Sequence, residues 1–496
     1  MRGHTCALLL IAGLACHIPV ATAQSASKVE TASRGCPSGI GPAHAPAGSL
    51  DHHIQDAIRR AGPGGMVRLS GEYTIWQTLE LLDGSVLCSD AGATLSWADR
   101  SRPGLMISAT RANATRILSL VLDGRGIAIK GSGHAIEGNL IRNIQADGGA
   151  AQRWGERHGV FIVDRGDRLI IRNNVFTQIV DTGVMGYNIN RSLIAANSFQ
   201  DLHEGIHLFS VSQTQIRQNT GSRLRAMGIE IQGDNLPGLV IENNRFKDWH
   251  PQHVSKAYVM SVVSGLGAVF KGNVIEGHPE MSAGLEIGGE GAQVTDNTLM
   301  DASLVIATAP DAVIRNNRIV RASIHKDVNR VPSGRLLIEG NTIEDAPRVG
   351  IFADEWGGYD QVTIKGNRIS KRLTEGTVDF VGIVASPFRK QPLLILDNVI
   401  RFEVAGRNRP VRAVCIANGG YQGNLRGMQV SGNTCLGAGV GLFSDSNSLG
   451  GHVGVQYRRN KLVRLQNTIT GDTEGLQATD NELTDVAADN ARLRTP

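Results

Sequence analysis

The feature that most constrains this chain is a short phrase that recurs along most of its length: an apolar strand, an asparagine, one intervening residue and another apolar residue. Clear copies surround Asn139, Asn174, Asn197, Asn244, Asn273, Asn317, Asn341 and Asn367, and weaker copies surround Asn219, Asn297, Asn398, Asn433, Asn460 and Asn481. Their mean spacing of about 26 residues is typical of a solenoid, in which each repeat forms one coil of a stack.

The residues around each asparagine indicate that the coils are made of β-strands. The segments are short, rich in Val, Ile and Gly, and alternate with period two, as in LVIENNRF at residues 239–246, whereas helical repeats show a period near 3.6. Asparagine tolerates the left-handed backbone region that a turn requires. Stacked asparagine amides can also hydrogen-bond from one coil to the next. We therefore expect a coiled parallel β-structure with an asparagine at one turn of every coil.

This pattern resembles the right-handed parallel β-helix of the pectate-lyase-like superfamily, with carbohydrate-binding and sugar-hydrolase type repeats, from about Val67 to Leu483. The resemblance implies an all-β fold: a single-stranded right-handed parallel β-helix (solenoid) with an N-terminal capping helix. The fold hosts lyases, hydrolases, epimerases and passive binding proteins, so it selects no activity by itself. The DPHD-like motif that a resemblance to alginate epimerases would imply is absent.

The first 23 residues are predicted to be a signal peptide. They contain a cationic start at Arg2, an apolar run, and small residues at Ala21 and Ala23 that form a cleavage site. Cys16 suggests a lipoprotein signal instead, but Gly13 stands where such a signal has a branched apolar residue. No other run reaches the length of a membrane span. We expect a periplasmic or secreted protein without a membrane span.

Two further regions follow. Residues 24–47 are rich in Ser, Gly, Ala and Pro and are predicted to be a flexible lead-in, and residues 48–490 are predicted to form the β-helix domain. This domain opens with a predicted helix that has Ser49 as its N-cap and an apolar face made by Ile54, Ala57, Ile58 and Ala61. The helix resembles the capping helix that covers the open first coil in pectate-lyase-like proteins.

The charge and the cysteine content indicate which kinds of partner and which cellular compartment to expect. A net charge of +4 over 496 residues, with the basic residues scattered, argues against a nucleic-acid partner. The mature chain would retain Cys36, Cys88, Cys415 and Cys435. A disulfide between Cys36 and Cys88 would join the N-terminal segment to the first coils, while Cys415 and Cys435 are either a second disulfide or free buried thiols. The chain is predicted to be a monomer or, like some relatives of the fold, a homotrimer.

A second strand in each coil carries the predicted function. It reads glycine, apolar, variable, apolar, and begins at Gly159, Gly183, Gly205, Gly228, Gly284, Gly350, Gly382 and Gly441. Side chains alternate between the faces of a strand, so the variable residues point outward and stack into one column. The column reads Phe161, Met185, His207, Glu230, a coil near Tyr258 of unassigned register, Glu286, Phe352, Val384 and Phe443. The next outward position reads Val163, Tyr187, Phe209, Gln232, Gly288 and Asp354.

Two acids in this column suggest a glycosidase. Neighbouring coils lie roughly 4.8 Å apart, so Glu230 and Glu286, two coils apart, would be separated by roughly 9.5 Å at the backbone. That separation is close to the window of roughly 6.5–9.5 Å for the two carboxyl groups of an inverting glycosidase. One carboxyl would protonate the leaving oxygen and the other would activate water. His207 would orient or tune Glu230.

The loops are predicted to bind the glycan. Residues are inserted at 148–159, 248–257, 371–378 and 402–412, and insertions in a repeat protein are often on its binding face. Tryptophans there, including Trp249 and Trp356, are suited to stacking on sugar rings, and Arg or Lys is suited to a uronate. The predicted substrate-binding residues are Tyr187, Gln232, Asp234, Lys256, Trp154, Arg157 and Asp354.

Three functions remain open on the sequence. The favoured one is an exported enzyme that hydrolyses a polysaccharide, such as a bacterial exopolysaccharide or a cell-wall glycan, without a cofactor. A polysaccharide lyase is the second, with His207 and Tyr187, or Lys256 and Arg157, acting on a uronate. The acids that would bind Ca²⁺ in such a lyase are Glu204, Glu230, Asp234, Glu286 and Glu290. The third is a non-enzymatic protein that handles a glycan or a metal, with Met185, His207 and the histidines of residues 250–253 as a metal array.

Overall fold

The structure is a computed structural model of the chain. It describes residues 35–37, 43–44, 51–145, 154–233, 237–250, 258–262, 265–278, 283–326, 334–353, 359–373, 380–385, 393–404, 413–419, 425–437, 439–445, 452–471 and 475–487. The chain divides into two compact units, Met1–Ala32 and Ser33–Pro496. The predicted signal peptide, 1–23, lies outside the described residues, as does almost all of the predicted lead-in, 24–47.

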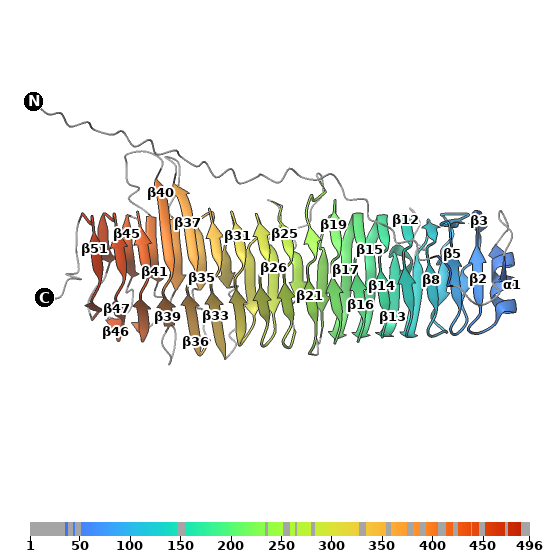
Figure 1. The fold of residues 1–496 in the computed structure, drawn as a ribbon, viewed down its shortest axis with the longest axis horizontal. Helices are drawn as coiled ribbons and strands as arrows, with labels where there is room; N and C mark the ends of the chain where they lie inside the picture. The colour runs from blue at the N-terminus through green and yellow to red at the C-terminus, as the bar shows by residue number, and fades with distance from the viewer. Residues whose placement is uncertain are drawn as a thin grey trace, which may run out of the picture. The chain divides into compact units, whose positions relative to one another are not determined.

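The unit Ser33–Pro496 is built almost entirely of parallel β-strands. Within the described ranges most strands belong to two sheets, one of 18 strands and one of 31, and every register assigned between neighbours is parallel. The coils follow one another in chain order (Figure 1). One coil illustrates the plan: β18 (Gln215–Arg217) lies in the smaller sheet, and β19 (Thr220–Ser222) and β20 (Ile229–Gln232) lie in the larger one.

The predicted asparagine ladder is present at every position that the sequence pattern marked. In each step the side-chain amide of one asparagine donates to the side-chain oxygen of the next at 2.9–3.0 Å, from Asn139 through to Asn481. The same amide also donates to a backbone carbonyl of the preceding coil, as Asn197 does to Ile171 at 2.9 Å. These bonds satisfy buried amides that would otherwise destabilise the turn.

The left-handed backbone falls one residue earlier than we predicted. The ladder asparagines do not have positive φ, but the residues before them do, including Asn173 (φ 57°), Gln218 (φ 56°) and Gly272 (φ 64°). The ladder asparagine is thus needed for its buried hydrogen bonds. The residue before it makes the left-handed turn, which explains why Asn, Asp or Gly often stands there.

The core is a continuous set of Ile, Leu, Val and Phe side chains inside the coils. It also explains the glycine that begins each outward strand. A Cβ at Gly183 would clash with the ring of Phe199 and with the carbonyl of Gly205, and a Cβ at Gly228 would clash with the ring of Phe246. Glycine at these positions therefore lets the outward strand pass close to the core phenylalanine of the next coil.

The helix α1 (Asp51–Ala61) is the one α-helix among the described residues. It contacts β1 (Ala43–His44), β2 (Met66–Leu69), β3 (Glu72–Ile75) and β4 (Leu79–Glu80), and lies beside β2 in Figure 1. Its side chains Ile54, Ala57 and Ile58 are buried in the core, and Ala61 packs against its edge, as the apolar spacing predicted.

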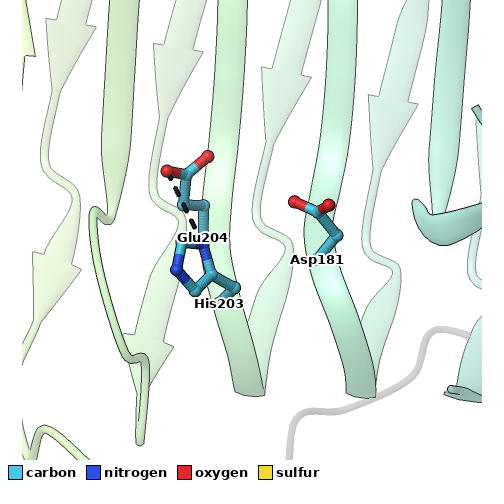
Figure 2. Close-up of side chains that lie close together, drawn as sticks. All are labelled: Asp181, His203 and Glu204. Carbon is cyan, nitrogen blue, oxygen red and sulfur yellow. Dashed lines mark ion pairs between the residues drawn. The ribbon is translucent and has the colours of Figure 1, made fainter. Parts of the chain in front are cut away.

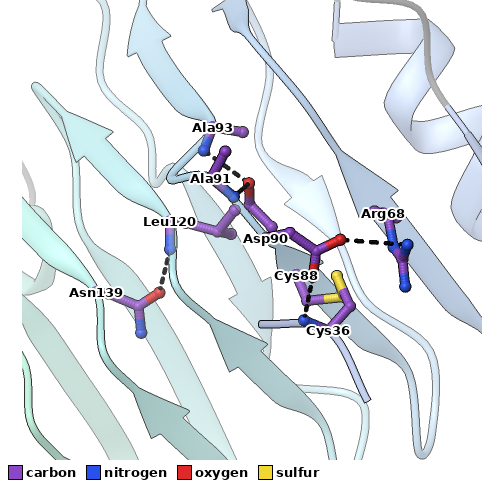
Figure 3. Close-up of a disulfide and its surroundings, with 9 residues drawn as sticks. Cys36, Arg68, Cys88, Asp90, Ala91, Ala93, Leu120 and Asn139 are labelled. Carbon is purple, nitrogen blue, oxygen red and sulfur yellow. Dashed lines mark hydrogen bonds and ion pairs between the residues drawn. A yellow bond between two sulfur atoms is a disulfide. The ribbon is translucent and has the colours of Figure 1, made fainter. Parts of the chain in front are cut away.

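Cys36, Cys88, Cys415 and Cys435 form two disulfides. Cys36 is bonded to Cys88 of β5 (Val86–Ser89), with the two Cα atoms 5.4 Å apart. The backbone N–H of Cys36 donates to Asp90, which also pairs with Arg68 (Figure 3). Cys415 is bonded to Cys435, with Cα atoms 6.1 Å apart, which decides between the two alternatives that the sequence left open.

Candidate functional site

The predicted outward column is confirmed by the pairing of the strands. Glu230 stands between Ile229 and Ile231, which are both in the core, so its side chain is on the opposite face of the strand. The strands that carry the centre of the column are β13 (Val160–Asp167), β15 (Val175–Asn190), β17 (Ser198–Ser212), β20, β23 (Tyr258–Val262), β26 (Ala283–Gly288), β29 (Leu304–Thr308), β32 (Ile324–Lys326) and β35 (Val349–Ala353). Along them the paired residues are Phe161, Met185, His207, Glu230, Ser261, Glu286, Val305, His325 and Phe352.

This register completes and corrects the predicted column. The coil that could not be assigned near Tyr258 contributes Ser261, between Glu230 and Glu286. Two coils, with Val305 and His325, had been missed between Glu286 and Phe352. Neither β29 nor β32 begins with the glycine on which the sequence pattern relied.

The two glutamates of the column are buried. Glu230 is 7% exposed and Glu286 is 9% exposed, so the alternative that both are solvated residues of an open sheet is wrong. The side-chain amide of Gln232 donates to Glu230, and the hydroxyl of Ser261 donates to Glu286. Each carboxylate therefore has a hydrogen-bond donor of its own.

His207 lies between two carboxylates. Its Nδ1 is 3.0 Å from Oε2 of Glu204, on the same strand, and 3.2 Å from Oε2 of Glu230, on the next coil. Its Nε2 is buried and has no hydrogen-bond partner among the described residues. The predicted contact of His207 with Glu230 is therefore present, and Glu204 joins the pair.

The contacts among His207, Glu230 and Glu204 shift the pKa values of all three side chains. Burial disfavours a charged imidazole, but the hydrogen bond from His207 to Glu204 and the charges of both glutamates outweigh it and raise the pKa of His207. Burial raises the pKa of Glu230, and the charge of Glu204 raises it further against the opposing charge of His207. The pKa of Glu204 is lowered because, although burial raises it, the His207 hydrogen bond and charge dominate. The arrangement stabilises the anionic form of Glu204, the cationic form of His207 and the neutral form of Glu230 relative to isolated side chains.

An aromatic stack holds the imidazole. The ring of Phe209 is stacked on His207, with centroids 4.7 Å apart, and on Tyr187 of the preceding coil, with centroids 5.1 Å apart. Phe161 meets Tyr187 edge-on at 6.4 Å. Phe209 therefore contacts both rings, and its contribution is to orient His207. Burial raises the pKa of Tyr187, so its phenol loses its proton less readily.

A second polar group adjoins this site, and two of its members, Asp181 and Thr182, were not indicated by the sequence pattern. The hydroxyl of Thr182 donates to Asp181 at 3.2 Å and to Glu204 at 3.3 Å. Nε of Arg157 lies 3.4 Å from Asp181, and Nδ1 of His158 lies 4.0 Å from it. Burial lowers the pKa of His158 to about 4, so its imidazole is neutral near pH 7. These residues come just before the outward glycines.

The structure separates the other predicted residues into three groups. Asp234, Lys256, Asp354 and Trp356 lie outside the described residues, as does the side chain of Trp154. Arg157 ends the short helix η1 (Trp154–Arg157) and pairs with Asp181 instead of pointing along the column. Tyr187 and Gln232 both occupy the second outward position, two coils apart with Phe209 between them, as predicted.

Two predicted contacts to ligands are corrected. Met185 is 0% exposed, so it cannot contribute to the predicted metal array on the surface. Trp249 is buried and its indole N–H donates to the carbonyl of Glu276 at 2.6 Å. It therefore packs as part of the fold and has no free ring face for a sugar.

Comparison with known families agrees with this geometry. The family model described as "Right handed beta helix region" matches residues 125–299. The chain contains a right-handed parallel β-helix. This confirms, at the level of the fold, the pectate-lyase-like resemblance that the sequence suggested. No curated protein matches the sequence of this β-helix chain. No helix in the described part of the β-helix chain combines the length and apolarity needed to cross a membrane.

Solved structures of low sequence identity are similar to the β-helix. One is a mannuronic acid specific polysaccharide family 6 lyase from human gut microbiota, with 15% identity, a TM-score of 0.45, and coverage of 65% of this chain and 86% of that one. Another is the catalytic unit of a GH87 alpha-1,3-glucanase from Streptomyces thermodiastaticus, with 13% identity, a TM-score of 0.40, and coverage of 92% of this chain and 71% of that one.

Proposed function

We propose that this protein hydrolyses a glycosidic bond of a polysaccharide, with Glu230 as the general acid and Glu286 as the general base. The observation that carries the proposal is the position of these two buried carboxyl groups in one outward column, two coils apart with Ser261 between them. At a coil spacing of roughly 4.8 Å their backbones are separated by roughly 9.5 Å. An inverting glycosidase has its two carboxyl groups roughly 6.5–9.5 Å apart, with space for a water molecule and the sugar.

The electrostatics support the assignment of Glu230 as the acid. A general acid must hold its proton at the working pH, and burial together with the charge of Glu204 raises the pKa of Glu230. His207 is held by Glu204 and Phe209 at 3.2 Å from Glu230. It is thus suited to orient the carboxyl group and to stabilise the carboxylate that forms when the proton leaves.

Glu286 has a different environment that suits a base. It accepts a hydrogen bond from the hydroxyl of Ser261, which stands between Glu230 and Glu286 in the column. A carboxylate in this position would remove a proton from a water molecule on the face of the sugar opposite to the leaving group. Ser261 would orient that carboxylate, a role that the sequence did not predict.

The same geometry argues against the lyase that the sequence left open. A lyase needs a base to remove a proton and a cation to neutralise the uronate. In the described part of the site, two carboxylates beside His207 raise its pKa and disfavour the neutral imidazole that a base requires, and the raised pKa of Tyr187 disfavours the phenolate. The carboxylate proposed as the general base, Glu286, would also repel an anionic sugar, so we infer that the substrate is a neutral glycan.

The experiment that tests this function is incubation of the protein with a panel of neutral and uronate-containing polysaccharides. The proposal predicts new reducing ends from a neutral polysaccharide without the ultraviolet absorbance of an unsaturated uronate. Unsaturated products would identify a lyase instead. Binding of a polysaccharide without cleavage of any panel member would support the passive role.

We also infer that the protein is exported and that α1 caps the first coil. Two disulfides in the chain support an oxidising compartment. The burial of Ile54, Ala57 and Ile58 against the first strands supports the cap, because an open solenoid end would expose its core. Cleavage behind Ala23, measured by N-terminal sequencing of the exported protein, is the test of the export proposal.

A further inference from the structure

The cluster of Asp181, His203 and Glu204 offers a set of metal ligands beside the candidate active site. One ligand atom of each residue lies within 4.8 Å of the corresponding atoms of the other two. Figure 2 shows Asp181 on one strand and His203 with Glu204 on the neighbouring strand. Two carboxylates with one imidazole are a donor set for Zn²⁺ and similar divalent transition metals, whereas Ca²⁺ and Mg²⁺ prefer oxygen ligands alone.

The register of the two strands explains why these side chains meet. Ile179 pairs with Leu202 and Thr182 pairs with Glu204, so two residues of β15 stand opposite one residue of β17. This bulge places Asp181 beside His203. Without it, regular strand pairing would leave the two residues out of register. A β-bulge often redirects a side chain next to a functional site.

The two oxygens of Glu204 have different partners. Oε2 is 3.0 Å from His207 and belongs to the candidate active site. Oε1 is turned the other way and lies 3.7 Å from Nδ1 of His203. The carboxylate can therefore bind a metal through Oε1 and keep its hydrogen bond to His207 through Oε2.

The other two ligands are also available to an ion. The side chain of His203 is 46% exposed, so its ring can rotate and an ion can reach it from solvent. Asp181 has Arg157 as a neighbour, but Nε of Arg157, 3.4 Å away, makes no hydrogen bond among the described residues. In a tetrahedral zinc site two donors lie about 3.4 Å apart, since each is about 2.1 Å from the metal. The donors would therefore close by at most about 1.4 Å, which rotation of His203 and Glu204 supplies.

We propose that Asp181, His203 and Glu204 bind one divalent transition-metal ion of the Zn²⁺ class, and that Glu204 joins this ion to the candidate active site. Thr182 would orient both carboxylates, because its hydroxyl contacts Asp181 and Glu204. The outer positions of the ion would be filled by water, since the described ligands number three. The proposal does not depend on the glycosidase assignment, because it concerns the binding of an ion.

The test is calorimetric titration of the purified full-length protein, first stripped with a chelator, with Zn²⁺. His203→Ala is the informative variant because the side chain is half exposed and has no part in the proposed catalysis. His53→Ala is the matched control, an exposed histidine on α1 outside any described ligand cluster. We expect one zinc ion per chain and an affinity at least about 10-fold weaker in His203→Ala, since even the loss of a supporting contact typically costs 10–100-fold.

A second readout is thermal stability. An ion that binds only the folded chain raises the melting temperature, so Zn²⁺ should stabilise the wild type and His53→Ala, but not His203→Ala. Equal zinc affinities and equal thermal shifts in His203→Ala and in wild type would overturn the proposal. Binding of Ca²⁺ with no binding of Zn²⁺ would overturn it as well. Both measurements are independent of any polysaccharide, so their failure is distinguishable from failure of the proposed hydrolysis.

Discussion

Nδ1 of His207 lies 3.2 Å from Oε2 of Glu230 on the neighbouring coil. The two residues are 23 positions apart in the chain and meet because they occupy one outward column. An imidazole beside a buried carboxyl group, next to a second carboxylate at Glu204, is a common way to adjust the pKa of an acid for catalysis. The predictions below follow from this relationship and from the ladder that fixes it.

Activity should fall as the pH rises through the pKa of Glu230. Glu230, the proposed general acid, must be protonated for the reaction. Burial raises the pKa of Glu230 above the ordinary glutamate value of 4.5. The alkaline limb of the kcat/KM profile should therefore lie above pH 4.5. The measurement is initial rates of reducing-end release across pH in a buffer containing a chelator. An alkaline limb at or below the ordinary glutamate value would contradict the assignment.

His207→Asn should move that alkaline limb to higher pH. The positive charge of His207 lowers the pKa of Glu230, and the negative charge of Glu204 raises it. Without the imidazole only the charge of Glu204 acts, so the pKa of Glu230 should rise. The measurement is the same pH profile on the variant. His325→Asn, in the same column but beyond Glu286, is the matched control and should leave the limb in place. A shift to lower pH in His207→Asn would show that the imidazole does not act on Glu230.

The pH dependence of stability should differ between the wild type and Glu230→Gln. The folded-state pKa of Glu230 is raised, so the folded chain holds this proton more tightly than the unfolded chain does. Its contribution to stability is therefore fully present below the unfolded pKa and is lost as pH rises through the folded pKa. Calorimetric melting temperatures should show the wild type losing stability relative to Glu230→Gln over that range. Glu242→Gln, a replacement on the other sheet, should not show this pH-dependent difference from the wild type. If the wild type instead gained stability relative to Glu230→Gln over this pH range, the prediction that folding raises the pKa of Glu230 would be wrong.

Asn297→Ala should destabilise the ladder at its centre. Asn297 donates to Phe270 and Asn317, and its side-chain oxygen accepts from Asn273. Because each buried polar group left unsatisfied costs about 1–3 kcal/mol, we expect a loss of at least about 2 kcal/mol in the free energy of unfolding. Urea denaturation measures this loss. Asn113→Ala is the control: this side chain is exposed and accepts one bond from Ser132, so its loss should cost less than about 1 kcal/mol. Equal losses in the two variants would rule out the ladder as a stabilising element.

Most of the fold could be predicted because the coil repeats its chemistry at a nearly constant period. A buried amide needs a hydrogen-bond partner in the next coil, so an asparagine recurs in the sequence once per coil. Asn219 and Asn297 belong to the ladder even though the sequence around them matches the pattern weakly. The turn itself was predicted less well. The residue with positive φ precedes the asparagine, since the asparagine uses its side chain for hydrogen bonds.

The site could be predicted only where glycine marks the start of an outward strand. His207, Glu230 and Glu286 follow such glycines, whereas Ser261, Val305 and His325 do not, so their coils were unassigned or missed. The β-bulge in β15 also could not be predicted from the sequence. The pairing of Asp181 with His203, and the turning of Glu204 toward His207, therefore required the three-dimensional structure.

The measurement that tests the central claim most directly is reducing-end release from a neutral polysaccharide by the wild type, Glu230→Gln, Glu286→Gln and the control Glu242→Gln. Positioned acids and bases contribute about 10²–10⁴-fold each, so both column variants should lose at least about 100-fold in kcat while their melting temperatures show that they remain folded. The Glu242→Gln variant should retain wild-type activity, because Glu242 lies in the other sheet. Full activity in folded Glu230→Gln or in folded Glu286→Gln would contradict the account.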